Sequence, residues 1–360
     1  MVEATRREAN ELYTLFRLLG QGVVNQADAE GKPAAEVPLV AIEREEHDGR
    51  RRYVVHGTEI RVTSPEMGEC FPREDFVAAA NLLQERLAEA QDTLDLSDLE
   101  GFLDALKIYD MEAQTDDRTD MHLQLWSAEG GPLVGVRVQS RLCGYLPLLA
   151  GGRTANLKFE QTGVRFSQPA VQKINWTEQP ENLAEVARRI LYIESQGGIF
   201  KFADVADKVF RSNLLMIDTN LPRILATMLR ALHIDGVSRM TDLVALLEEK
   251  NPLKMKDELV KKHGFYRHKL SQLLLASAWG MRPGKQYNGR ESAVGGYLFV
   301  DAQGGVVLFD RGHEQTFADY LLTHTRLEKS LPEDDKYGYL ERENGAYYLK
   351  LNLKIGIAKR

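Results

Sequence analysis

Cysteine is scarce in this sequence, with two residues in a chain of 360. Cys70 and Cys143 belong to no CxxC pair and no Cys/His ligand spacing, which argues against a disulfide framework and a structural zinc site. The histidines form no HExxH set, and there is no GxxxxGK[ST] phosphate loop and no GxSxG elbow. Zinc hydrolase, P-loop motor and α/β-hydrolase chemistry therefore find no support.

Long hydrophobic runs are also missing. The opening MVEATRREANELYTLFRLLG carries charges through its first ten residues and holds no apolar run of the length of a signal peptide or membrane anchor. We therefore expect a cytoplasmic protein with no membrane partner. With 43% hydrophobic and 28% charged residues, the chain has the composition of a packed protein, and its length suggests two or three folded units.

Positive charge is not in excess, because the formal net charge is −7. A general polyanion binder usually has a basic surface, so nonspecific nucleic-acid binding is disfavoured. A sequence-specific DNA enzyme remains compatible with this charge, since its basic groups need only line one cleft.

Hydrophobic periodicity predicts an α+β protein in three parts. In residues 1–177, helices are expected at 3–20, 76–90 and 96–106, with two strands within 37–63 and a hairpin over 120–142. Residues 178–290 are predicted to be helical, including segments 202–211 and 256–279. Residues 291–360 are predicted to be β-rich, with hairpins at 295–309 and 339–355 and a short helix at 317–322. The boundaries rest on shifts in composition alone.

The predicted hairpin over 120–142 places polar side chains on one face. A symmetric turn at 128–131 pairs Asp120 with Gln139, His122 with Arg137 and Gln124 with Gly135. The opposite face carries Met121, Leu123, Leu125, Val134, Val136 and Val138 and is predicted to be the core face. The polar face is then either a plain solvated surface or a site with an acid at one end.

The segments flanking this hairpin favour a site. Carboxylates gather in 112–120, where oxygen ligands suit a hard divalent cation. The glycines and Arg153 of the segment GYLPLLAGGRT (144–154) allow backbone to approach a phosphate.

A second candidate is VKKHGFYRHKL (260–270), the densest mixture of basic and aromatic residues in the chain. Its candidate DNA-contacting residues are Lys261, Lys262, Arg267, His268 and Lys269. The alternative is a solvated helix start that binds nothing.

The stretch from Asp116 to Phe159, ending in PLLAGGRTANLKF, resembles the core of the HpaII family of type II restriction endonucleases. The resemblance continues in the same order along the chain, from EANELYTLFRLLGQG at the start, through NLLMIDTNLPRILATML, WGMRP and AVGGYLFV, to FADYLLTHTRLE and YYLKLNLKI. The individual motifs are short, and their collinearity carries the resemblance.

The resemblance implies a PD-(D/E)xK nuclease core in residues 1–177, a mixed sheet flanked by helices. It also implies Mg²⁺-dependent hydrolysis of duplex DNA at 5′-CCGG and a cytosine methyltransferase as a genetic neighbour. Whether the chain acts as a monomer or a homodimer is left open. By position Asp120 would be the metal-binding acid.

The sequence departs from the family pattern at the second strand. The family's Ser-x-Lys falls on Arg137-Val138-Gln139. Glutamine can hydrogen-bond the attacking water but brings no positive charge. Arg137 or Lys158 would then be the source of the missing charge, or the site has decayed.

A Mg²⁺ site also needs a second carboxylate, because one aspartate binds the ion weakly without further oxygen ligands. Glu8 and Glu11 match the two glutamates of the family's opening helix, and their spacing of three residues puts both on one face. We therefore assign Asp120 and Glu11 as metal ligands, with Glu8, Arg137 and Gln139 in the catalytic set and Asp117 as a weaker candidate. The alternative functions are a DNA-binding homologue with a degenerate site and another phosphodiester chemistry on the same scaffold.

Overall fold

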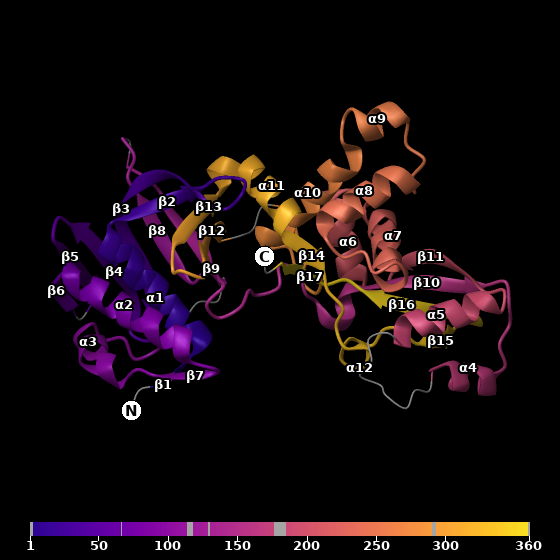
Figure 1. Ribbon diagram of the computed structural model, residues 1–360, viewed down its shortest axis with the longest axis horizontal. Coiled ribbons are helices and arrows are strands. Elements are labelled where there is room, and N and C mark those ends of the chain that lie inside the picture. Colours follow the sequence, from indigo (N-terminus) through magenta and orange to yellow (C-terminus); the bar gives the residue numbers. More distant parts are fainter. Residues whose placement is uncertain are drawn as a thin grey trace. The chain divides into compact units, whose positions relative to one another are not determined.

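The computed structural model describes residues 3–65, 67–113, 118–128, 130–175, 185–289 and 293–358. The chain forms two compact units (Figure 1). Unit 1 consists of residues 1–145 and 292–320, and unit 2 of residues 146–291 and 321–360. Each unit is therefore built from two separate stretches of sequence, and the chain leaves unit 1 after residue 145 and returns to it at residue 292.

Unit 1 contains most of the strands. Its elements are β1 (Glu3–Thr5), α1 (Arg6–Gln21), β2 (Val23–Ala27), β3 (Pro33–Glu46), β4 (Gly49–His56), β5 (Glu59–Ser64), β6 (Met67–Pro72), α2 (Arg73–Glu89), β7 (Thr93–Asp95), η1 (Ser97–Leu99), α3 (Glu100–Ala105), β8 (Met121–Leu125), β9 (Leu133–Ser140), β12 (Val294–Val300), β13 (Val306–Asp310), η3 (Arg311–His313) and the start of α11 (Glu314–His324).

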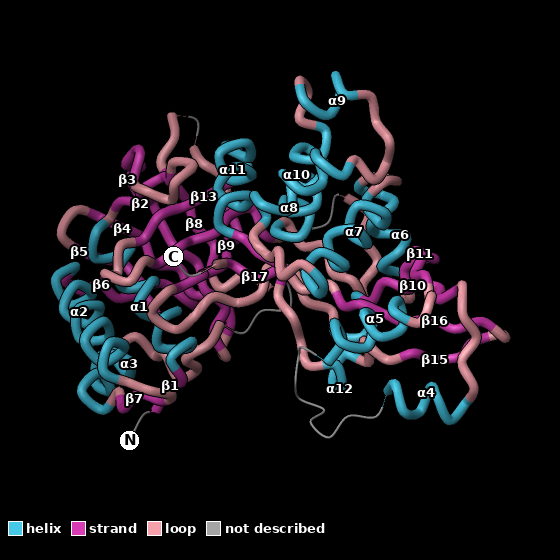
Figure 2. The backbone as a smooth tube through the Cα atoms, turned by 45° about the vertical axis from the view of Figure 1, so that its right-hand side comes forward, coloured by secondary structure: helices cyan, strands magenta, loops and turns pink. Residues whose placement is uncertain are grey.

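Nine strands of unit 1 form one sheet in the order β2-β13-β12-β9-β8-β3-β4-β5-β6. The long strand β3 pairs with β2 through its first half and with β4 and β8 through its second half. Because β13 also pairs with β2, the strands β2, β13, β12, β9, β8 and β3 close into a six-stranded barrel (Figure 2). β12 runs parallel to β9, whereas β8 and β9 are antiparallel.

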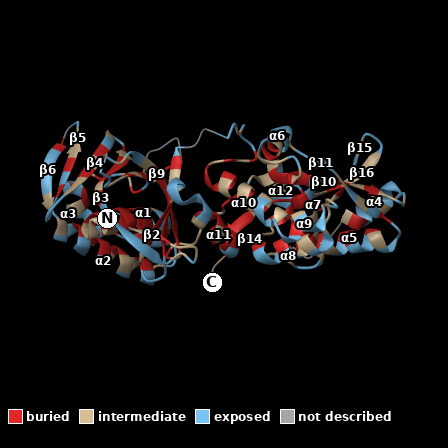
Figure 3. Ribbon diagram, turned by 90° about the horizontal axis from the view of Figure 1, so that it is seen from above, coloured by how far each residue is buried: buried red, intermediate tan, exposed pale blue. Residues whose placement is uncertain are grey.

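The sheet of unit 1 is covered on both faces where β9 and β12 lie. One face packs in a single hydrophobic cluster with α1 and α2, which lie side by side (Figure 1). On the other face Tyr297 and Phe299 of β12 pack against Phe317 and Tyr320 of α11 in tilted and edge-to-face contacts. Helix α1 is accordingly buried over most of its length (Figure 3).

Unit 2 combines a small sheet with a group of helices. Its elements are η2 (Gly152–Ala155), β10 (Asn156–Thr162), α4 (Gln168–Asn175), α5 (Glu185–Ser195), β11 (Ile199–Val205), α6 (Lys208–Ile217), α7 (Leu221–Ile234), α8 (Met240–Lys250), α9 (Asp257–Lys261), α10 (Phe265–Ala278), the end of α11, β14 (Thr325–Leu327), α12 (Pro332–Asp335), β15 (Leu340–Glu343), β16 (Ala346–Asn352) and β17 (Ile355–Ile357).

The small sheet has the antiparallel order β11-β10-β16-β15, so two distant parts of the sequence form one surface. A second pair, β14 and β17, lies apart from it. None of the helices in the described ranges is both long and apolar enough to cross a membrane.

The α+β class is confirmed, but several predicted elements are wrong in detail. Segment 202–211 is the end of strand β11 followed by helix α6, because Asp207 accepts hydrogen bonds from Val209 N and Phe210 N and so caps a helix that begins later. The helix predicted at 256–279 is interrupted at Gly264, whose φ of 58° is left-handed. The predicted region 37–63 holds the end of β3, all of β4 and most of β5.

The division of the chain also differs from the three parts expected from composition. Strands β12 and β13 belong to unit 1, whereas β14 to β17 belong to unit 2. Composition cannot reveal this, because a strand looks the same whichever sheet it joins.

Candidate active site

Glu11 is held in place by a well-capped helix. Thr5 and Glu8 form a reciprocal capping box at the start of α1, and the helix ends at Gly22, which adopts the left-handed conformation. Apolar residues on several sides of α1 pack into the core, so Glu11, near the middle of the helix, is only 3% exposed. The same capping box engages the Glu8 carboxylate, whose Oε2 accepts from Thr5 N and Thr5 Oγ1.

One oxygen of Glu11 is fully engaged. Its Oε1 accepts from Arg44 Nε at 3.0 Å and from the backbone N–H of Ala113 at 2.9 Å. Arg44 is completely buried, and it also donates to Glu46 and to the carbonyl of Met111. Among the residues that the structure describes, Glu11 Oε2 has no hydrogen-bond partner and can face a ligand.

Asp120 lies directly before β8 and is fixed by β9. Its N–H donates to Val136 O at 2.8 Å, and its Oδ2 accepts from Val138 N at 2.6 Å. Asp120 Oδ1 makes no hydrogen bond within the described part of the chain. Like Glu11, this carboxylate therefore has one anchored oxygen and one available oxygen.

The register predicted for the hairpin is wrong by two residues. His122 pairs with Gly135 and Gln124 with Leu133, which sets Asp120 level with Arg137 rather than Gln139. The ladder ends at the pair of Gln124 with Leu133, just before Pro132, which has no N–H to donate. Beyond this pair, Trp126 N donates to Pro38 O of β3. Because the shift is even, the predicted division of side chains between the two faces is retained.

The polar face of this hairpin is not a solvated surface. Arg137 is 8% exposed and Gln139 is 1% exposed. Strand β12 lies beside β9 and sets Tyr297 next to Arg137 and Phe299 next to Gln139, and α11 covers these rings. Arg137 hydrogen-bonds to Tyr297. The sequence could not show this, because β12 enters the sheet from more than 150 residues away.

The two carboxylates influence each other. The pKa of Glu11 is raised to about 7, because burial and, to a smaller extent, the negative charge of Asp120 outweigh the lowering effect of Arg44. Burial also raises the pKa of Asp120, opposed by the Val138 N–H and by Arg137 and Arg7. Two carboxylates in a poorly solvated place repel each other unless a proton or a cation lies between them.

This donor set fits Mg²⁺. Mg²⁺ is commonly held by one or two carboxylates, with water and substrate phosphate as the remaining ligands. Glu11 and Asp120 each offer a free oxygen, and a cation would relieve their repulsion. No group of three or more His, Cys, Asp or Glu side chains suited to a metal occurs in the described ranges, so any further ligands would not come from such a cluster.

Other predicted residues lie elsewhere or in different surroundings. Lys158 of β10 pairs with Glu343 and lies over the Tyr348 ring, all in unit 2. Asp117 falls outside the described residues. Glu112, which the sequence pattern showed only as part of an acidic run, pairs with Arg7 at 3.1 Å and contributes to the field at Asp120.

The predicted DNA-contacting residues belong to unit 2, and three of them are already paired. Lys261 and Lys262 form ion pairs with Asp257 and Glu258 one turn earlier in the helix, and Lys269 pairs with Asp218 at 2.6 Å. Arg267, His268 and Arg153 are exposed. The positive charge of this stretch is thus smaller than its lysine content indicates.

Arg44 is the residue of the site that sequence reasoning missed. It lies on the same face of β3 as Ile42 and Glu46, and all three are buried. A charged residue on the apolar face of a predicted strand was the signal that could have found it, because such a group needs a buried partner.

Comparison with known proteins adds to this geometry. The HpaII restriction endonuclease family model matches residues 5–357. The type II restriction enzyme HpaII of Haemophilus parainfluenzae is 27% identical over 357 residues, which cover 97% of each chain. No solved structure matches the chain significantly. The match over nearly the whole length shows that this chain belongs to the HpaII family of restriction endonucleases.

Proposed function

We propose that the protein is a type II restriction endonuclease that hydrolyses duplex DNA at CCGG with Mg²⁺. The observation that carries the proposal is the pair Glu11 and Asp120, two carboxylates that interact electrostatically and each keep one oxygen available. The family membership supplies the reaction class. The CCGG target and the PD-(D/E)xK assignment of unit 1 rest on the resemblance of the motifs.

In the proposed mechanism Asp120 and Glu11 would hold the metal. Arg44 and the Ala113 N–H orient the Glu11 carboxylate, and the Val138 N–H orients that of Asp120. A Mg²⁺ ion held by these two carboxylates would supply Lewis-acid chemistry, which would polarise the scissile phosphate and lower the pKa of the attacking water. Gln139 places this water, and Arg137, level with Asp120, supplies positive charge close to the phosphate.

DNA outside the cut site is proposed to contact Arg153 and the α9–α10 segment, through Lys261, Lys262, Arg267, His268 and Lys269. A cytosine methyltransferase is the expected genetic partner, because host CCGG sites would need protection. A cytoplasmic location is part of this proposal, because it is the usual one for restriction enzymes.

The second candidate function is a DNA-binding homologue that no longer cuts. Gln139 in place of the family lysine favours it, since the position then lacks a charge that stabilises the developing negative phosphate.

The deciding experiment incubates the protein with a plasmid that carries CCGG sites, a plasmid that lacks them, and a CCGG plasmid with methylated cytosines. We expect Mg²⁺-dependent cuts only in the unmethylated CCGG plasmid, with ends that map to that sequence. Specific binding to CCGG without cuts, with Mg²⁺ or Mn²⁺, would support the second candidate. If the protein neither bound nor cut any of these plasmids, the result would contradict both candidate functions.

A further inference from the structure

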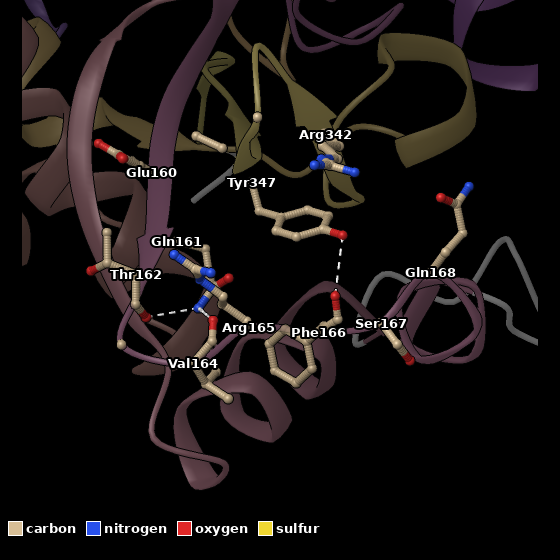
Figure 4. Close-up of a pocket in the computed structure, with 13 residues that line it drawn as sticks. Glu160, Gln161, Thr162, Val164, Arg165, Phe166, Ser167, Gln168, Arg342 and Tyr347 are labelled. Carbon is tan, nitrogen blue, oxygen red and sulfur yellow. Dashed lines mark hydrogen bonds between the residues drawn. The ribbon is translucent and has the colours of Figure 1, made fainter.

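Unit 2 contains a cavity of about 700 Å³ that the proposed active site does not use. Its walls are the end of β10, the following loop at 163–168 and the hairpin of β15 and β16 (Figure 4). This volume lies within the range of pockets for small organic ligands, about 300–1,000 Å³.

Paired strands form one wall of the cavity. Tyr347 of β16 pairs with Arg342 of β15 on one side and with Gln161 of β10 on the other. The Gln161 Nε2 donates to Thr162 O at 2.7 Å and to Val164 O at 3.0 Å, which fixes the loop as it leaves β10. Gly163 starts this loop with a φ of 90°, and a side chain there would collide with the carbonyl of Gly197.

An aromatic ring faces the cavity at a fixed position. The Tyr347 hydroxyl donates to Phe166 O at 3.2 Å, and in Figure 4 the ring lies between Arg342 and Phe166. Both rings pack against a small hydrophobic cluster formed by Ile174, Ile193 and Leu340. An aromatic surface held in this way can stack with a planar ligand at little cost in entropy.

The charge of the cavity is positive. Arg165 of the loop and Arg342 of β15 are both exposed, and neither makes an ion pair with any residue that the structure describes. The neighbouring cations of the same sheet differ, since Lys158 and Lys350 pair with Glu343 and Glu341. Glu160 is the one carboxylate among the lining residues, and strand alternation points it away from Gln161 (Figure 4).

We propose that this cavity binds one nucleotide, with its phosphate on Arg165 and Arg342 and its base against Tyr347 and Phe166. Guanidinium groups suit phosphate oxygens, and an aromatic ring offers a base a surface on which to stack. The nucleotide is either a unit of the bound DNA or a free nucleotide. The first source rests on the proposed function, whereas the second does not.

The experiment compares the whole protein with the double variant Arg165→Gln/Arg342→Gln and with Tyr347→Leu, which keeps an apolar side chain but removes the ring. Arg223→Gln is the matched control, because Arg223 of α7 is exposed and makes no ion pair in the described part of unit 2. Thermal melting checks that each variant folds. The probes are a CCGG duplex containing 5-iododeoxyuridine for photo-crosslinking, and deoxycytidine 5′-monophosphate, with deoxycytidine as the probe without phosphate.

We expect duplex cross-links at Phe166 or Tyr347, and DNA affinity about tenfold lower in the double variant but unchanged in Arg223→Gln. The nucleotide pocket would be overturned if the unaltered protein and the double variant bound DNA with equal affinity and showed no saturable binding of the monophosphate. The proposed function would still stand in that case. Lost affinity without a cross-link at either ring would also overturn it, since the arginines would then contact only the DNA backbone.

The free-nucleotide arm separates the two proposals. If the protein bound no DNA but bound the monophosphate, and the double variant did not, the pocket would stand and the proposed function would fail. If it bound neither DNA nor monophosphate, both would fall.

Discussion

Glu11 and Asp120 are costly residues for the folded chain, because each is an acid in a place where burial opposes its charge. Their anchoring hydrogen bonds offset part of this cost. If the pair binds a metal as proposed, the cation would offset the rest of this cost, and such a trade of stability for activity is usual at functional sites.

Asp120→Asn should abolish cleavage while the fold is kept or becomes slightly more stable. The asparagine carbonyl oxygen can still accept from Val138 N, and the buried charge disappears. Plasmid cleavage and the melting temperature measure the two effects. Asp98→Asn, at an exposed acid paired with Arg86, is the control that should cut normally. Full activity of Asp120→Asn would rule out this residue as a metal ligand.

The stabilisation by Mg²⁺ should increase with pH. The pKa of Glu11 is raised from 4.5 to about 7, so the folded state binds a proton that the unfolded state releases between these values. Its contribution to stability is therefore present below the lower value and is lost as pH rises through the higher one. Above about pH 7 the ionised carboxylate is free to bind Mg²⁺. We expect a larger Mg²⁺-induced rise in melting temperature at about pH 8 than at about pH 6.

In Glu11→Gln this pH dependence of the Mg²⁺ effect should largely disappear, because glutamine does not titrate. Without metal, the variant should gain stability relative to the unaltered protein as pH rises. A Mg²⁺ effect that stayed equally steep in Glu11→Gln would assign the titration to another group.

Gln139→Lys tests whether glutamine is a working substitute. The lysine would add a cation in a place that is 1% exposed, where such a charge can affect the barrier by several kcal/mol. We expect a changed cleavage rate or metal preference, and cutting by the variant if the unaltered protein does not cut. Gln139→Met, of similar size but without a hydrogen-bonding amide, should be inactive. Equal rates for all three proteins would remove position 139 from the mechanism.

For single residues, the sequence predicted which face of a strand a side chain occupies better than it predicted how buried that side chain is. Alternation placed Asp120, Arg137 and Gln139 on one face, and the structure retains that face. Their burial depends on β12 and α11, which are remote in sequence, and so does not follow from local pattern. The role of Arg44 depends likewise on α1 meeting β3.

The bounds of helices and strands depend on capping residues and loop residues, which hydrophobic periodicity does not reveal. The β8–β9 ladder ends just before Pro132, and the N–H of Trp126 bonds to Pro38 O of β3 rather than to β9. The break between α9 and α10 follows from Gly264. Long amphipathic segments such as α1 and α2 were predictable because their apolar stripes are continuous.

The proposed DNA contact of the α9–α10 segment can be tested with a variant that is expected to bind DNA more strongly. Asp257→Asn combined with Glu258→Gln removes the partners of Lys261 and Lys262. If this segment contacts DNA, affinity should increase and its dependence on salt should become steeper, because two more lysines are free to neutralise phosphates. Binding assays over a range of salt concentrations measure both. Unchanged slopes would show that α9 does not contact DNA.

The whole molecule consists of two units that depend on the C-terminal region in different ways. Unit 1 needs residues up to 320, since β12 and β13 complete its sheet and α11 covers one face. Unit 2 needs β16, which lies between β10 and β15 in its small sheet. Composition predicted a separate β-rich part here, and only the pairing partners show that it is shared between the units.

Removal of residues 339–360 should therefore disrupt unit 2 and spare unit 1. Hydrogen exchange should show lost protection in β10 and β11 and retained protection in β8, β9 and β12. Removal of residues 359 and 360 alone is the control and should change neither. Protection lost equally in both units would show that they fold as one cooperative body.

The closure of the barrel has a consequence for the nascent chain. Strand β9 is synthesised roughly 150 residues before its parallel neighbour β12, an interval on the order of 10 s at typical translation rates. Until then β9 is an edge strand with unpaired backbone groups, and the wall beside Arg137 and Gln139 does not exist. A chain that stalls on the ribosome before residue 294 exposes this strand edge and lacks the wall beside Arg137 and Gln139, so under the proposed function it could not cut DNA before β12 is made.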